Sequence, residues 1–163
     1  MTKNSLSSKN MKPLDPNLKE IQDENERIFK QALADNPNLK YEIISEKNFC
    51  NKMVNDNPYL KELYDKHVKY YDEINPNLFL GELSELLLNY ASDLDKLFDT
   101  TKQEFVNKLT AYINNSYITE NDDVKNLIAV SYVENITPRD AGYLQLKPFL
   151  SELIIKDIES PWT

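Results

Sequence analysis

One histidine and one cysteine, His67 and Cys50, are available for chemistry in this chain of 163 residues. Zinc sites and nucleophilic triads draw on several such side chains, so we expect neither a zinc cluster nor a triad. His67 falls on an apolar helical stripe, which predicts a packed or surface structural role rather than a catalytic one. Cys50 has Phe49 and Met53 beside it on an apolar face, which predicts a buried, unreactive thiol.

Glycines and carboxylates add no catalytic pattern. Gly81 and Gly142 are far apart, which excludes the glycine-rich loops that bind phosphates and dinucleotides. Gly81 lies in a leucine-rich segment, where we expect it to permit close approach of another helix, and Gly142 is expected to mark a turn. Carboxylate pairs at helical spacing, such as Glu82 and Glu85, are interpreted as a solvated face. The sequence thus predicts no cofactor, no metal and no enzymatic activity, with a carboxylate-dependent enzyme as an alternative.

The charge of the chain excludes some partners. The formal net charge is −8, and residues 1–13 contain three lysines and no acidic residue, which leaves −11 on residues 14–163. Such a surface would repel phosphates, so we expect no nucleic-acid partner. An acidic surface attracts basic proteins, although the same charge can serve solubility alone.

Several features of the sequence predict a cytoplasmic protein. A single cysteine cannot form an intramolecular disulfide, and the N-terminus lacks the apolar stretch of a secretory signal. The apolar runs, such as residues 86–88, are too short to span a bilayer, so no membrane partner is expected. The sequence does not indicate an oligomeric state.

Helices are the elements that must position these side chains. The Asn-Gly and Asp-Gly pairs of strand-rich folds are absent, whereas Asn or Asp precedes proline four times, a typical helix start. These pairs are Asp15-Pro16, Asn36-Pro37, Asn57-Pro58 and Asn75-Pro76.

Apolar residues spaced three and four apart predict a helix after most of these pairs. The first helix is expected to end before Pro37. An extended piece or connector is predicted over residues 41–44, with Ser45 as the cap of the next helix. The leucine-rich segment after Pro76 is expected to be buried on more than one side, and another broadly apolar helix is predicted over 124–136.

The predicted fold class is all-α, either an antiparallel helical bundle or a short HEAT-like α-solenoid of about six to eight helices. Residues 1–13 are predicted to form a mobile basic tail, and residues 14–163 a single helical domain. Within that domain, N-terminal helices over 14–75 would precede stacked core helices over 76–163.

Two blocks of sequence carry a resemblance that begins at Asp56. They are DNPYLKELYDKHVKYYDEINPNLFLGELSELLLNY and, after one further helix, DDVKNLIAVSYVENI. They resemble a family of small acidic helical bacterial proteins of unknown function, similar to immunity proteins of contact-dependent or polymorphic toxin systems between bacteria. The resemblance implies a cytoplasmic binding protein that neutralises a cognate toxin, and it offers no catalytic residues. An adaptor or regulatory helical scaffold is the alternative.

Two acidic clusters flank one predicted helix and are the candidate partner-binding residues. The first comprises Asp93, Asp95 and Asp99, and the second comprises Tyr117, Glu120, Asp122 and Asp123. The connections that carry them should lie at opposite ends of the helix, so one cluster should dominate binding. We favour the second because its tyrosine adds an aromatic anchor for a basic toxin. Alternatively, its aspartates only complement the dipole of a helix capped by Asn121 or Thr119.

Overall fold

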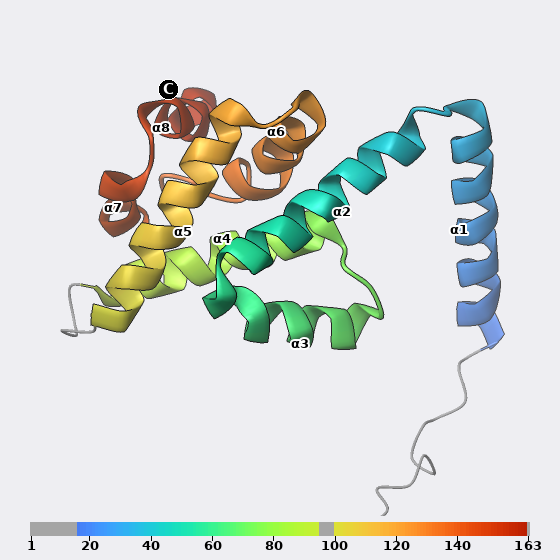
Figure 1. The fold of residues 1–163 in the computed structure, drawn as a ribbon, viewed down its shortest axis with the longest axis horizontal. Helices are drawn as coiled ribbons and strands as arrows, with labels where there is room; N and C mark the ends of the chain where they lie inside the picture. The colour runs from blue at the N-terminus through green and yellow to red at the C-terminus, as the bar shows by residue number, and fades with distance from the viewer. Residues whose placement is uncertain (1–15, 95–99, 163) are drawn as a thin grey trace, which may run out of the picture. The chain divides into compact units, whose positions relative to one another are not determined.

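The computed structural model describes residues 16–94 and 100–162, and the regular structure within these ranges is helical (Figure 1). The predicted all-α fold class is therefore confirmed. Short 3-10 or π-helical turns accompany eight α-helices in the described part of the chain. These helices are α1 (Pro16–Asp35), α2 (Leu39–Asp56), α3 (Lys61–Tyr71), α4 (Pro76–Asp93), α5 (Thr100–Thr119), α6 (Asp122–Ile128), α7 (Tyr143–Leu146) and α8 (Glu152–Glu159).

The chain divides into two compact units, Met1–Tyr41 and Glu42–Thr163. The first contains α1, which ends before Pro37 as predicted. The tail predicted over residues 1–13 lies outside the described residues. The single helical domain over 14–163 stays a prediction.

The prediction for residues 41–44 is wrong. In place of an extended connector capped by Ser45, α2 runs without a break from Leu39 to Asp56. It begins directly after the Asn36-Pro37 pair, where the Leu39 amide donates to the Asn36 carbonyl at 3.1 Å. Ser45 lies inside the helix, and its Oγ accepts a hydrogen bond from the Asn121 side chain at 2.9 Å. Helix continuity thus outweighs the weak strand preference of the isoleucines.

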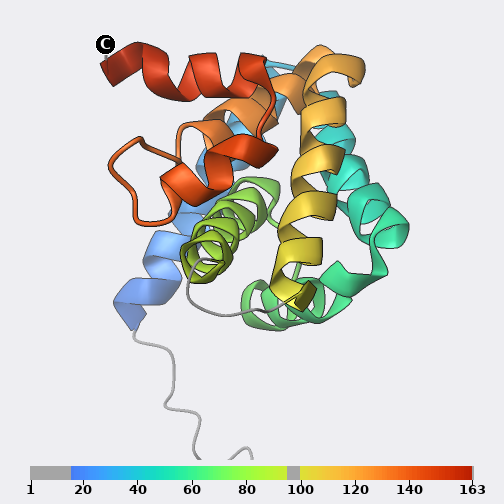
Figure 2. The same ribbon diagram turned by 90° about the vertical axis from the view of Figure 1, so that its left-hand side faces the viewer.

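α4 is the central helix of the second unit. Its cap is Asn75, whose side chain accepts the Leu78 amide at 3.2 Å, and Pro76 takes the first helical position as predicted. α4 contacts α5, α6, α7 and the turn after α6, and Figure 2 shows α5 and α7 against different sides of it. Burial on more than one side is confirmed by these contacts, and five residues of α4 have no exposed surface: Phe79, Leu80, Leu83, Leu87 and Ala91.

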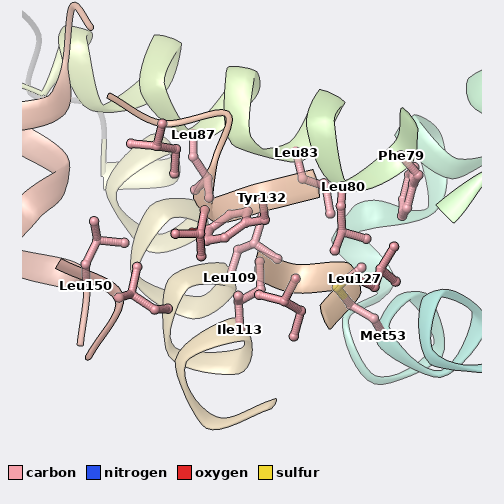
Figure 3. Packing of buried hydrophobic residues seen from close by; sticks show 14 of the residues in the cluster. Met53, Phe79, Leu80, Leu83, Leu87, Leu109, Ile113, Leu127, Tyr132 and Leu150 are labelled. Carbon is pink, nitrogen blue, oxygen red and sulfur yellow. The ribbon is translucent and has the colours of Figure 1, made fainter. Parts of the chain in front are cut away.

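The core lies where α4 meets α5 and α6 (Figure 3). Leu83 and Leu87 of α4 extend toward Leu109 and Ile113 of α5, with the Tyr132 ring among them. These side chains are fully buried, and each buried aliphatic side chain contributes roughly 1.5–3 kcal/mol to stability. The Tyr132 hydroxyl has no hydrogen-bond partner among the described residues.

The prediction of one helix over 124–136 is wrong beyond Ile128. There α6 ends and a π-helical turn over Ala129–Val133 follows. The Glu134 amide donates to the Ala129 carbonyl at 3.0 Å, and this i to i+5 bond closes the wider turn. The turn places Ser131 against Asn77 of α4, and the Ser131 hydroxyl donates to Asn77 Oδ1 at 2.6 Å. The next residue, Tyr132, is buried in the core.

Candidate functional site

The favoured acidic cluster lies where α5 ends and α6 begins, and we call Tyr117, Glu120, Asp122 and Asp123 the α5–α6 corner. Tyr117 is half-buried against the core, and its hydroxyl donates to Asp157 Oδ2 at 2.7 Å. Burial and this hydrogen bond raise the pKa of the Tyr117 hydroxyl to about 12. The tyrosine that was predicted to anchor a partner therefore already joins α5 to α8.

The acidic residues of the α5–α6 corner also have structural neighbours. Glu120 lies 3.8 Å from the Lys52 ammonium of α2. Asn121 caps α6, as predicted, by accepting the Val124 amide at 3.0 Å. Asp122 and Asp123 occupy the first turn of α6, where they complement the helix dipole. The geometry thus agrees with the alternative explanation of these two aspartates.

The other acidic cluster is only partly described. Asp93 forms an ion pair with Lys102 at 2.8 Å, and Asp95 and Asp99 lie outside the described residues. Asp93 pairs with the first turn of α5 and Glu120 follows its last residue, so the 20 residues of this helix, about 30 Å, separate them. For Asp93, the one described residue of the first cluster, the predicted separation from the second cluster is observed.

His67 is buried, with both ring nitrogens hydrogen-bonded. Nε2 accepts the Asn75 amide at 3.0 Å, so the proton of the neutral ring lies on Nδ1 and is donated to Glu82 Oε2 at 2.9 Å. The ring therefore joins the end of α3 to the start of α4, and the predicted packed role is confirmed.

Cys50 lies in the core with no exposed surface, as predicted. Burial, with a smaller contribution from the Glu46 carboxylate, raises the pKa of the Cys50 thiol to about 12. The thiol is thus protonated at neutral pH. No group of three histidine, cysteine or carboxylate side chains within 16–94 and 100–162 is arranged to hold a metal.

A different surface includes exposed side chains, Tyr70 and Glu85, that form no hydrogen bond or ion pair in the described part of the chain. We call it the α4 face, and it comprises the ends of two tyrosine side chains on α3, the outer stripe of α4 and the turn after α6: Tyr70, Tyr71, Leu78, Glu82, Glu85, Asn135 and Asp140. Leu78, Glu82 and Glu85 follow i, i+4, i+7 spacing and so share one side of α4.

The first hollow of the α4 face, about 340 Å³, lies over the His67 ring. Tyr70 is 81% exposed at its edge, and its ring lies 4.8 Å from that of Tyr71. Lys66 also lines this hollow, but its ammonium pairs with Glu62 at 2.9 Å. An exposed tyrosine beside a second aromatic ring is the kind of rigid anchor that protein interfaces use.

The second hollow, about 460 Å³, lies beside Gly81, and we call it the Gly81 hollow. Leu78 and Leu88 form apolar walls, and Glu85 and Asp140 contribute carboxylates. Glu85 is exposed and has no lysine or arginine within ion-pair distance in the described part of the chain. Among the residues that the structure describes, no lysine or arginine lines this hollow.

The Gly81 hollow joins the two sequence blocks that carry the resemblance. Asn77 and Gly81 come from the first block, and Asn135 comes from the second. A Cβ atom on Gly81 would lie 3.5 Å from Asn135 Nδ2 and 3.8 Å from the Ser131 carbonyl, which are ordinary van der Waals contacts, so the packing expected at this glycine would also admit an alanine. The sequence analysis missed this site, and its one available signal was a glycine inside a helix, which costs about 1 kcal/mol relative to alanine.

Comparison with known proteins places the chain in a family. Residues 50–159, which include the α4 face, match DUF7674, a domain of unknown function. The chain belongs to this family. No curated protein and no solved structure matches this chain. None of the helices described here is both long and apolar enough to cross a membrane.

Proposed function

We propose that the protein binds a basic protein toxin in the cytoplasm and neutralises it, as an immunity protein of a contact-dependent or polymorphic toxin system does. The observation that carries the proposal is the α4 face, where an exposed tyrosine pair lines one hollow and Glu85, a carboxylate that no described cation neutralises, lines the other. Tyrosine anchors contribute affinity, and carboxylates attract basic partners and speed association.

The net charge and the resemblance of the two sequence blocks support the same function. Residues 14–163 carry −11, so a basic domain would be attracted from a distance. Immunity needs only a complementary surface that covers or distorts the toxin, and it requires no catalytic group. An adaptor or regulatory scaffold needs a similar surface but would bind several partners.

The carboxylate-dependent enzyme has less support. Glu85 and Asp140 do line one hollow. The Asp140 carboxylate, however, already accepts the Thr137 amide at 2.6 Å and so closes the turn after the π-helical segment. A pair of carboxylates with separate acid and base roles needs both groups available to the substrate.

Co-expression with the C-terminal domain of a toxin encoded by a neighbouring gene tests the proposal. We expect a 1:1 complex, survival of the toxin-producing cells, and an association rate that falls steeply as salt rises. Absence of both the complex and the protection would overturn it. Several unrelated proteins recovered on the same surface would favour the scaffold.

Two variants locate the interface in the same assay. Tyr70→Ala changes the α4 face, and the double change Asp122→Asn with Asp123→Asn changes the α5–α6 corner. We expect the first to weaken the complex and the second to leave it intact. The reverse result would place the interface at the corner that the sequence analysis favoured.

A further inference from the structure

We propose that the Gly81 hollow receives an arginine side chain of the basic partner, an inference that rests on the proposed function and specifies its binding chemistry. The hollow has about 460 Å³, within the range of pockets that accept small ligands. Its two leucines, Leu78 and Leu88, offer apolar walls against which the methylene stem of an arginine can pack.

Internal hydrogen bonds determine which polar groups of the hollow remain for a ligand. Asn135 Nδ2 donates to the Ser131 carbonyl at 2.7 Å, which leaves Asn135 Oδ1 as an acceptor. The Ser84 hydroxyl donates to the Gly81 carbonyl at 2.7 Å. Asp140 uses Oδ2 for the Thr137 amide and keeps Oδ1. The remaining groups are therefore mainly acceptors, with the Asn77 amide nitrogen and the second N–H of the Asn135 amide as donors among them.

The exposed Glu85 carboxylate adds a negative charge to this lining, and no described lysine or arginine lies within ion-pair distance of it. A cation with several donors complements such a lining. Arginine fits better than lysine because its planar guanidinium can donate to a carboxylate and to an amide oxygen at the same time. Gly81 matters because any longer side chain at this position would extend into the hollow.

Peptide titrations test this inference without the toxin. The full ¹⁵N-labelled chain is titrated with Ac-Ala-Arg-Ala-NH2, with its citrulline counterpart, which has the same shape and no charge, and with the lysine peptide. We expect saturable shifts of the Gly81 backbone amide and the Asn135 side-chain amide with arginine, and much weaker shifts with the other two. Equal responses to arginine and citrulline, or no saturation, would overturn the proposal. An equal response to lysine would overturn the choice of arginine.

Variants connect the response to the hollow. Glu85→Gln should weaken arginine-peptide binding about threefold to tenfold, because it removes one charge-assisted hydrogen bond at a solvated site. Gly81→Met should abolish the Asn135 response by filling the hollow. Glu104→Gln removes an exposed carboxylate of α5 and is the matched control that should bind normally. Unchanged binding by both hollow variants would refute the site.

The two proposals can fail separately. Arginine-peptide binding at the hollow without protection from any toxin would remove the immunity function and leave the site. Protection of cells that Glu85→Gln and Gly81→Met retain in full would leave the immunity function and remove the arginine site.

Discussion

The α5–α6 corner and the α4 face are both acidic, but their side chains have different neighbours. At the corner, Tyr117 holds Asp157 and Glu120 lies near Lys52. On the α4 face, Tyr70 is 81% exposed and Glu85 has no described cation beside it. The two regions therefore contain similar residue types, but those at the corner already have partners within the fold, whereas Tyr70 and Glu85 remain available to a binding partner.

This difference shows why a cluster of carboxylates and tyrosines is not by itself a binding site. A hydrogen bond within the fold lowers the binding energy available to a partner, because the partner must replace a bond that already exists. Changes at the corner should therefore alter stability, and changes on the α4 face should alter affinity.

The largest effect is expected from Tyr70→Ala on the α4 face. Removal of an exposed aromatic anchor should weaken the complex with the toxin domain by about thirtyfold or more, since hot-spot side chains contribute at least about 2 kcal/mol. The free energy of unfolding should stay within about 0.5 kcal/mol of the original value, because the side chain is mostly in solvent. Calorimetric titration and urea unfolding give the two quantities. An unchanged affinity would contradict the assignment of the α4 face.

The matching change at the α5–α6 corner is Tyr117→Phe. It removes the hydrogen bond to Asp157 and should lower the free energy of unfolding by about 1 kcal/mol. Affinity for the toxin domain should not change. A loss of affinity without a loss of stability would show that Tyr117 serves a partner instead.

The same variant has a pH signature. The pKa of the Tyr117 hydroxyl is about 12 in the folded protein and about 10 in an unfolded chain. A raised pKa stabilises the fold below pH 10, and this contribution is lost as pH rises from 10 to 12. Unfolding measured across this range should therefore show the original protein and Tyr117→Phe converging in stability. A constant difference across the range would count against the raised pKa, which burial and the hydrogen bond to Asp157 together cause.

A third prediction concerns Asn121, the cap of α6. Asn121→Ala removes the acceptor for the Val124 amide and the donor to Ser45, and should cost about 1 kcal/mol of stability. Asn121→Asp keeps the cap acceptor and is the control that should retain most of the stability. Thermal unfolding distinguishes the two. Equal stability of all three proteins would remove the structural role given to this end of α6.

Helices were predictable from the sequence because their starts have local signals. Asn75 and Pro76 mark the start of α4, and Asn121 caps α6, as expected. The π-helical turn over Ala129–Val133 was not predictable, because it depends on the contact between Ser131 and Asn77, which are 54 residues apart.

The candidate site was less predictable than the fold. Residue types pointed to Tyr117 as an anchor, but they could not show that Asp157, 40 residues away, already accepts its hydroxyl. The Gly81 hollow depends on Asn135 and Asp140 reaching α4 from a distant turn. Only the glycine itself was visible in the sequence, and it was explained as a packing residue.

The smallest effect, and one of opposite sign, is expected from Gly81→Ala on the α4 face. The added Cβ would meet Asn135 Nδ2 at 3.5 Å and the Ser131 carbonyl at 3.8 Å, which are ordinary contacts. Alanine should therefore stabilise the helix by about 0.5–1 kcal/mol. Its methyl group also narrows the hollow, so binding of the arginine peptide should fall several-fold.

Ala111→Gly is the matched control for this change, because Ala111 is exposed on α5 and lies away from the hollow. It should lose a similar 0.5–1 kcal/mol of stability and leave peptide binding unchanged. Urea unfolding and the peptide titration measure both quantities for both variants. A gain in stability together with a loss of binding would mean that Gly81 keeps the hollow open at the expense of helix stability. Stabilisation with undiminished binding would mean that the glycine does not serve the hollow, and the contrast between the two regions would then depend on Tyr70 alone.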